Sequence, residues 1–334
     1  MPDAALTTLL SLSAADALGA ATEFKTPQAI HAHYGVIDTY QPGSVFGFAP
    51  GEATDDSQMV VATLLGYARS EGHPGVLAAL RAWLAAGPPD VGSLTRSALD
   101  TGRSAPDRLD GGVRAWQDSG HRSAGNGGLM RIAAVWIAGV RGEALARESA
   151  VVTALTHADP RCVHASVFLT AFLDALARGA AYAGAAAAAL DTMDRFDARG
   201  ALLDAGVLGV ESRGAFAAFT AQDRGARAQV RARVRAGLDG HVTSQSGFVL
   251  DTLEAAVAHA RADDWLGGVQ PAVLLGDDSD TVACVTGAIL GARGIAVPGD
   301  LLPPLRLGHS WPGWDRAWPC AERYPALLRN ARPA

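Results

Sequence analysis

Two acidic clusters, each followed directly by an apolar segment, constrain the fold of this chain more than any other feature of its sequence. Residues 54–57 read Thr-Asp-Asp-Ser and residues 278–281 read Asp-Ser-Asp-Thr. The clusters lie more than 200 residues apart, so only the tertiary fold can bring them together. If they meet, their carboxylates repel one another unless cations lie between them. Oxygen ligands without His or Cys suit a hard ion such as Mg²⁺ or Mn²⁺ rather than zinc.

Helix capping is the simpler interpretation of each cluster. Asp, Ser and Thr are preferred N-caps, and acidic residues in the first turn interact favourably with the helix dipole. A cap needs one such residue, whereas each cluster holds several. Both interpretations stay open at this point, and other features of the chain have to separate them.

The composition describes a soluble globular protein with a large core, because 49% of the 334 residues are hydrophobic and 19% are charged. A net charge of −6 argues against a general nucleic-acid binder, which relies on a basic surface. The cysteines Cys162, Cys284 and Cys320 show neither metal nor redox spacing and suggest a reducing compartment. The N-terminus lacks a signal-peptide pattern and no apolar run has membrane-spanning length, so we expect a cytoplasmic protein.

Helical periodicity dominates the chain, and we find no convincing β pattern, coiled-coil heptad, internal repeat or clear linker. Residues 27–51 predict a long irregular connection rich in Gly, Pro and Tyr. We therefore expect an all-α fold, a single compact orthogonal bundle of many helices over residues 1–334, with a Pro- and Trp-rich tail over 296–334 that wraps the core. Helices are expected over about residues 6–18, 55–69, 77–86, 93–100, 111–118, 143–156, 160–178, 183–195, 224–235, 249–260 and 278–291.

Features outside the two clusters bear on their interpretation. Asp16 and Glu23 are seven residues apart, close to two helical turns, so they share a face if the first helix extends that far. An Asp among Ala, Leu and Gly is unusual, because a buried charge needs a partner.

The turn over 125–128 exposes backbone N–H groups that can hold a phosphate, although a plain tight turn also fits. His157 lies at a helix junction, where a structural histidine is the simplest interpretation.

Taken in order, these motifs resemble the ADP-ribosylglycohydrolase family over about residues 5–295. Each motif is weak alone, whereas six in the same order are highly specific. Ala15 stands where the family usually has Gly, and Ser57 replaces the usual Thr but keeps a hydroxyl. The motifs are Asp16-Ala17-Leu18-Gly19 with Glu23, residues 54–57, Gly125-Asn126-Gly127 through Met130-Arg131, Thr156-His157 with Pro160, residues 247–256, and residues 278–281.

The resemblance implies a central cleft in the all-α fold that holds two Mg²⁺ or Mn²⁺ ions. It implies catalytic roles for the carboxylates of Glu23, Asp55 and Asp278, without deciding which of them is the general acid or base. The implied metal ligands are Thr54, Asp55, Asp56, Asp278, Asp280 and Thr281. The implied ADP-ribose contacts are Asn126, Gly127, Gly128, Met130, Arg131 and His157.

The implied activity is hydrolysis of the bond between the anomeric carbon of the distal ribose and an acceptor. Arginine on a protein is the preferred acceptor, and serine, nucleic-acid bases and O-acetyl-ADP-ribose stay open. The expected partners are an ADP-ribosylated protein or another ADP-ribosyl conjugate, with ADP-ribose as product, no membrane, and nucleic acid only where it carries the ADP-ribosyl group. The alternatives are a two-metal phosphoesterase and a non-catalytic ADP-ribose-binding or structural protein.

Overall fold

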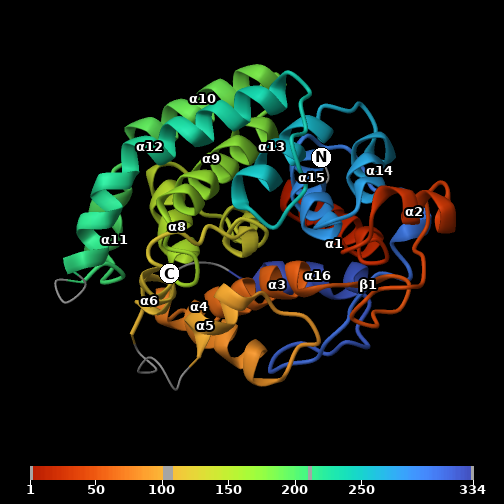
Figure 1. Ribbon diagram of the computed structural model, residues 1–334. Helices are drawn as coiled ribbons and strands as arrows, with labels where there is room; N and C mark the ends of the chain where they lie inside the picture. Colours follow the sequence, from red (N-terminus) through yellow and green to blue (C-terminus); the bar gives the residue numbers. More distant parts are fainter. Residues whose placement is uncertain (1–2, 101–107, 210–212, 332–334) are drawn as a thin grey trace.

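The prediction of an all-α fold is confirmed by the computed structural model, which describes residues 3–100, 108–209 and 213–331 (Figure 1). The helices are α1 (Ala4–Gly19), α2 (Pro27–Tyr34), α3 (Asp55–Tyr67), α4 (Gly72–Ala85), α5 (Ser93–Leu99), α6 (Gly111–Asp118), α7 (Ala133–Ile137), α8 (Glu143–Ala154), α9 (Pro160–Ala177), α10 (Tyr182–Arg195), α11 (Ala198–Asp204), α12 (Arg213–Leu238), α13 (Val249–His259), α14 (Trp265–Leu275), α15 (Ser279–Ala292) and α16 (Cys320–Asn330). Short 3₁₀ turns cover η1 (Asn126–Gly128) and η3 (Gly299–Leu301). No helix among the described residues combines the length and apolar character needed to cross a membrane.

Helices α1 and α15 lie side by side in the middle of the molecule and carry the first and last of the sequence motifs (Figure 1). Small residues let the two backbones approach closely. A Cβ added to Gly287 would lie 2.6 Å from the carbonyl oxygen of Ser11, and one added to Gly19 would lie 2.5 Å from the Cα of Asp280. The glycines therefore determine how near the start of α15 comes to the end of α1.

Substituting Gly19 with alanine is expected to destabilise the protein by about 1–3 kcal/mol, because backbone atoms on α15 leave no room for the methyl group. The matched control is Gly184→Ala on α10, where an added Cβ meets nothing within 4 Å. That change should stabilise the helix by about 1 kcal/mol. Urea unfolding of both variants measures the contrast. Equal free energies of unfolding in the two variants would contradict the close packing of α1 on α15.

The C-terminal segment supports the approach to the first acidic cluster. Strand β2 (Arg306–Leu307) pairs in parallel with β1 (Glu52–Ala53), directly before Thr54. Helix α16 packs on α1 and α3, and the hydroxyls of Tyr324 and Ser13 are 2.7 Å apart. The sequence showed no β pattern because each strand has only two residues, too few for a period-2 signal.

Several helices fall where none was predicted. The expected irregular connection over 27–51 contains α2, which begins where the hydroxyl of Thr26 accepts a hydrogen bond from the N–H of Ala29 and Pro27 takes the first helical position. Helices α11, α14 and α16 were also missed. Helix α14 has an internal proline at position 271 and a predominantly apolar sequence, so it lacks the polar face that marks an amphipathic helix.

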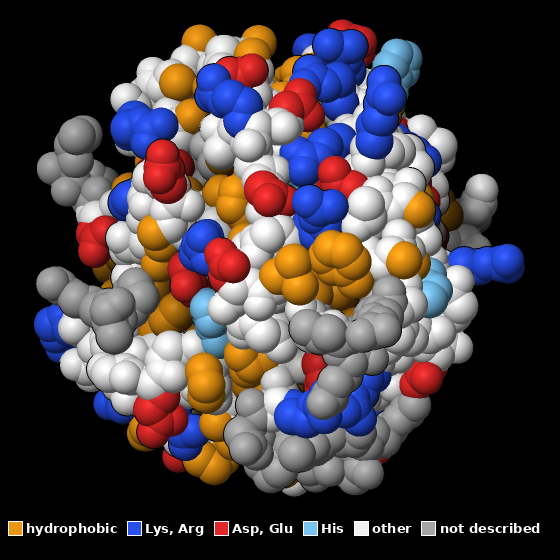
Figure 2. All heavy atoms as spheres, turned by 90° about the vertical axis from the view of Figure 1, so that its left-hand side faces the viewer, with side chains coloured by type: hydrophobic (Ala, Val, Ile, Leu, Met, Phe, Trp, Pro, Cys, Tyr) orange, Lys and Arg blue, Asp and Glu red, His pale blue; other side chains and the backbone are white. Residues whose placement is uncertain are grey.

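Several arginines of helix α12 form ion pairs with acidic residues. Arg227 pairs with Asp223 at 2.9 Å, and Arg233 pairs with Glu254 at 2.9 Å. On the face shown in Figure 2, Lys and Arg side chains are interleaved with Asp and Glu. This arrangement agrees with the prediction of a solvated, charged face rather than a basic stripe for nucleic acid.

Candidate active site

The structure brings the two acidic clusters together at the starts of α3 and α15. Thr54 and Asp278 are the N-cap residues of these helices, yet neither side chain makes a capping hydrogen bond. Instead, the hydroxyl of Thr281 donates to Asp56 Oδ2 at 3.2 Å, and the hydroxyl oxygen of Thr54 lies 3.1 Å from Asp280 Oδ2. Each cluster is thus bonded to the other, and capping does not account for their composition.

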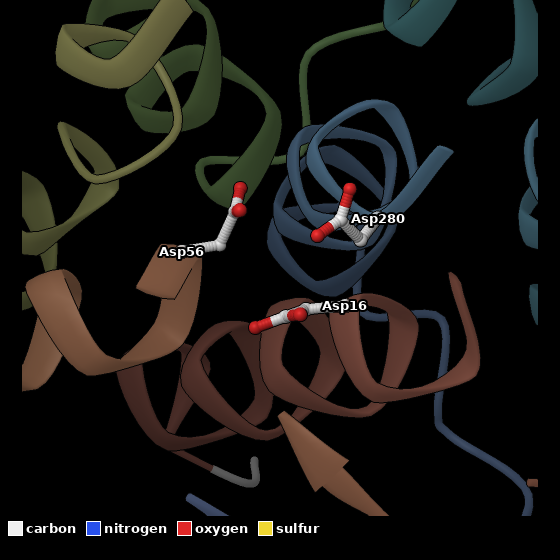
Figure 3. Close-up of side chains that lie close together, drawn as sticks. All are labelled: Asp16, Asp56 and Asp280. Atoms are coloured by element: carbon white, nitrogen blue, oxygen red, sulfur yellow. The ribbon is translucent and has the colours of Figure 1, made fainter. Parts of the chain in front are cut away.

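Asp16 anchors the first cluster from α1. Its carboxylate accepts hydrogen bonds from the N–H of Thr54 at 3.0 Å, the Thr54 hydroxyl at 2.8 Å and the N–H of Ser57 at 3.0 Å, as well as from the Ser57 hydroxyl. These donors are the partners that a buried aspartate requires. Asp16 is therefore a positioning residue, although its carboxylate points towards those of Asp56 and Asp280 (Figure 3).

Three carboxylate oxygens of the site are buried without a hydrogen-bond donor. They are Asp56 Oδ1, Asp280 Oδ1 and Glu23 Oε2. Carboxylate oxygens of Asp16, Asp56 and Asp280 lie within 4.8 Å of one another, and so do those of Glu23, Asp90 and Asp280. Buried, unsatisfied anionic oxygens at this spacing fit a hard divalent cation with oxygen ligands.

The electrostatics of the cluster agree with that fit. Burial, followed by the charges of nearby acids, raises the pKa of Asp55, Asp56 and Asp280 well above the ordinary value. Burial and the charge of Asp280 contribute most to the rise in the pKa of Glu23, to about 11. A cation bound among these acids would favour their ionised forms. It would therefore lower the pKa values that burial and mutual repulsion raise.

Asp90 is a member of this cluster that the sequence did not reveal. Its carboxylate is hydrogen-bonded to that of Asp55, and burial is the largest cause that raises its pKa to about 6. It follows Pro88 and Pro89 in an irregular segment, where an Asp is typical of an ordinary turn. No periodicity or spacing in the sequence could have marked it.

The glycine-rich turn η1 is attached to the second cluster. The N–H of Asn126 donates to the carbonyl of Gly247 at 3.0 Å, and Gly125 and Phe248 form an antiparallel bridge. The side-chain amide of Asn126 donates to Asp278 Oδ2 at 2.6 Å and to the hydroxyl of Thr252 at 2.9 Å. Asn126 therefore connects the turn, the start of α13 and an acidic residue of the site.

Not all of the predicted ADP-ribose contacts face the same space. A pocket of about 250 Å³ is bordered by Asn126, Gly127, Met130 and His157, but neither Gly128 nor Arg131 lines it. Arg131 is fully buried behind the turn, where its guanidinium donates to the carbonyl of Gly127 at 2.7 Å and to that of Val152 at 2.8 Å. The structure thus places Arg131 as a support for the turn, rather than at its open face.

The pocket has two chemically different ends. The acidic end contains Glu23, Asp55, Asp90, Asp278 and Asp280. The other end is formed by neutral groups, including Leu94, Thr95, Gly127 and His157. A Cβ at Gly127 would lie 2.9 Å from the Cε1 atom of His157, so the ring and the turn are in close contact. A ligand in this pocket meets backbone and imidazole at one end and carboxylates at the other.

His157 is held as a neutral ring. It is 4% exposed, its Nδ1 lies 2.8 Å from the hydroxyl of Thr156, and burial together with the charge of Arg131 lowers its pKa to about 3. Because this folded-state pKa lies below the ordinary 6.5, the unfolded chain binds the proton more tightly. His157 therefore reduces the free energy of unfolding as the pH falls from about 6.5 towards 3.

An NMR titration of the His157 ring should show no inflection between about pH 5 and pH 8. The His157→Gln variant identifies the signal, and it should also remove this residue's part of the acid-induced loss of stability. A ring that titrates near its ordinary pKa would contradict the buried, neutral state.

Fold and site together define an all-α protein with an acidic centre suited to divalent cations and an adjoining pocket. The ADP-ribosylglycohydrolase family model matches residues 2–332, and the chain belongs to this family. Among curated relatives, it is 28% identical over 301 residues to the ADP-ribosylarginine hydrolase Tri1 of Pseudomonas putida (strain GB-1), covering 87% of this chain and 70% of the relative. It is 27% identical over 304 residues to the ADP-ribosylarginine hydrolase Tri1 of Serratia proteamaculans (strain 568), covering 87% and 71%.

A solved structure described as an ADP-ribosylglycohydrolase-related protein complex has the same fold. The TM-score is 0.68 at 25% sequence identity, over 98% of this chain and 96% of the other. The family resemblance inferred from the six motifs is therefore confirmed, and it extends through the C-terminal segment that the motifs did not reach.

Proposed function

We propose that this protein is a hydrolase that releases ADP-ribose from ADP-ribosylated arginine with the help of divalent cations. The observation that carries the proposal is the convergence of the two acidic clusters, with unsatisfied carboxylate oxygens, at one end of a pocket whose other end is neutral. Arginine is the preferred acceptor because both curated relatives are named ADP-ribosylarginine hydrolases. The proposed partner is therefore an ADP-ribosylated protein.

The residues that would hold the cations come from both clusters. They are Thr54, Asp55, Asp56, Asp278, Asp280 and Thr281, and we propose two Mg²⁺ or Mn²⁺ ions because four ligand carboxylates balance two dications. When bound, such ions polarise ligand oxygens and lower the pKa of a bound water. A neutralised centre also lets an anionic diphosphate approach, which the bare carboxylates would repel.

The turn η1 and His157 bind and orient the ADP-ribosyl group in this proposal. The N–H groups of a glycine-rich turn suit phosphate oxygens, and a neutral imidazole can accept or donate a hydrogen bond without adding charge. With the diphosphate at this end, the distal ribose points towards the acids. Asn126 then holds Asp278 in place, and Arg131 holds the turn.

Glu23 is the best placed of the candidate carboxylates for proton transfer. Asp278 accepts a hydrogen bond from Asn126 and Asp55 is bonded to Asp90, whereas Glu23 keeps one oxygen without a partner. In the reaction, the oxygen of water bonds to the anomeric carbon while the bond from that carbon to the arginine nitrogen breaks. One proton of the water passes to the leaving nitrogen, and Glu23 is proposed to carry it.

The test is turnover of defined conjugates of arginine, serine, a DNA base and acetate, each carrying one ADP-ribosyl group. The proposal predicts intact ADP-ribose and free arginine from the first conjugate, and loss of that activity in EDTA with recovery in Mg²⁺ or Mn²⁺. If only another conjugate is cleaved, its acceptor replaces arginine in the proposed activity. Release of AMP would mean diphosphate cleavage, and the phosphoesterase alternative would then replace the proposal.

A further inference from the structure

A second cavity of about 500 Å³ lies directly beside the active-site pocket. Phe24, which follows Glu23 in the chain, borders both spaces. The wall between the spaces continues through the 277–278 peptide, since Asp277 faces the second cavity and Asp278 the first. The cavity thus adjoins the acidic side of the pocket, where the bond to the acceptor is proposed to break.

The described lining of this cavity combines exposed apolar side chains with polar groups and one exposed carboxylate. Phe24 is 63% exposed and Leu275 is 40% exposed, both high for large apolar side chains. Asp277 is the only carboxylate among the described lining residues and is also exposed. Among the described lining residues, Lys25 alone is cationic, and its ammonium group donates to the carbonyls of Ala21 and Gly43, which do not line the cavity. The surface therefore favours a cationic chain with aliphatic or aromatic contacts.

The backbone holds Phe24 and Asp277 in unusual conformations. Both have a φ of 56°, in the left-handed region that few non-glycine residues adopt and that is especially unusual for a bulky side chain such as that of Phe24. The N–H of Phe24 donates to the carbonyl of Asp277 at 2.7 Å, and the N–H of Asp277 donates to the carbonyl of Lys25 at 3.1 Å. Such strain persists where surrounding structure enforces it, and it is concentrated at functional sites. The pairing holds Phe24 and Asp277 together at the boundary between the two spaces.

We propose that this second cavity binds the polypeptide that carries the ADP-ribosyl group, through basic residues next to the modified arginine. The inference rests on the proposed function and extends it to the acceptor side. With the diphosphate at η1, the acceptor leaves the pocket at the acidic end, past Glu23, and Phe24 is the next surface along that path. Asp277 then pairs with a flanking Lys or Arg, while Phe24 and Leu275 contact its aliphatic portion.

The experiment compares kcat/KM for two substrates in the full-length, Mg²⁺-loaded enzyme. One is ADP-ribosylarginine as the free amino-acid conjugate, and the other is a peptide with one ADP-ribosylated arginine flanked by lysines. The test variant combines Leu275→Ala with Asp277→Asn, since Asn tolerates the left-handed conformation better than most residues. The matched control combines Leu203→Ala with Asp263→Asn. Leu203 and Asp263 are both exposed, and neither residue lines either of the two spaces.

The test variant should lower the ratio of peptide to amino-acid kcat/KM by about tenfold, and the control should leave it unchanged. Replacing the flanking lysines by serines should lower the same ratio for the wild type. If the wild type cleaves both substrates and the test variant leaves the ratio unchanged, docking in the second cavity is refuted while the proposed function stands. If the wild type cleaves neither, the proposed function fails, and the docking proposal fails with it.

Discussion

Replacing Asp280 with asparagine is expected to lower turnover by about three orders of magnitude or more, and to raise the melting temperature in EDTA. The loss of turnover follows because a ligand carboxylate contributes to a centre that supplies several kcal/mol of charge stabilisation. Asn keeps the shape of the side chain and places a polar group in the same space. The change therefore removes charge without opening a cavity.

The gain in stability follows from the raised pKa of Asp280. An acid whose folded-state pKa lies above its ordinary value of 3.8 destabilises the folded protein at every higher pH. In the cation-free protein the free energy of unfolding therefore falls as the pH rises from about 3.8 towards the folded-state pKa. The neutral amide escapes this cost, so the variant should be more stable than the cation-free wild type near pH 7.

Cations should reverse the order of the two proteins. Mg²⁺ is expected to stabilise the wild type by binding its folded state, and the variant should gain less because it lacks one proposed ligand. Thermal unfolding in EDTA and in Mg²⁺ measures both effects. The exposed Asp263→Asn variant is the control for a change of surface charge. An equal response of wild type and Asp280→Asn to Mg²⁺ would contradict the assignment of Asp280 as a ligand.

Substitution of Asp16 by alanine is expected to destabilise the protein by about 2–6 kcal/mol, because two buried N–H donors lose their acceptor at about 1–3 kcal/mol each, although this residue is not assigned as a ligand. The change leaves the buried N–H groups of Thr54 and Ser57 without their acceptor. It also releases the start of α3, so we expect cation affinity to fall by about 10–100-fold. Chemical unfolding measures the first effect, and calorimetry with Mg²⁺ measures the second.

The control for Asp16 comes from the same helix. Asp3 caps α1 by accepting one hydrogen bond from the N–H of Ala5 at an exposed position. Its replacement by alanine should cost about 0.5–2 kcal/mol without affecting cation affinity. Asp16→Asn should lose less stability than Asp16→Ala and more than Asp3→Ala. Its amide oxygen can still accept hydrogen bonds, whereas its NH₂ group cannot accept any from the donors that it faces. Unchanged cation affinity in Asp16→Ala would show that this residue does not position the first cluster.

Most of the centre could be predicted because its chemistry is visible in short stretches of sequence. Each cluster holds more acids than a helix cap requires, and each precedes an apolar helix whose period is plain. Asp16 stood out because a buried charge needs a partner, but its donors at Thr54 and Ser57 lie 38 and 41 residues away and could not be identified. Local pattern thus marked the residues, and the fold showed what they contact.

The parts that could not be predicted depend on contacts between distant backbone segments. Asp90 joins the centre from an irregular segment, and Arg131 lies behind the turn only because the carbonyls of Gly127 and Val152 meet there. The left-handed pair Phe24 and Asp277 exists because two loops exchange hydrogen bonds. None of these features has a periodic or local signature, since each residue type is common in ordinary loops or helices.

The most direct test of the account is anomalous scattering from a crystal grown with Mn²⁺. We expect anomalous density between the starts of α3 and α15, within reach of Asp56, Asp278 and Asp280, and its loss in the Asp280→Asn variant. Density confined to the protein surface, with none between the two acidic clusters, would contradict the claim that they form one cation-binding centre.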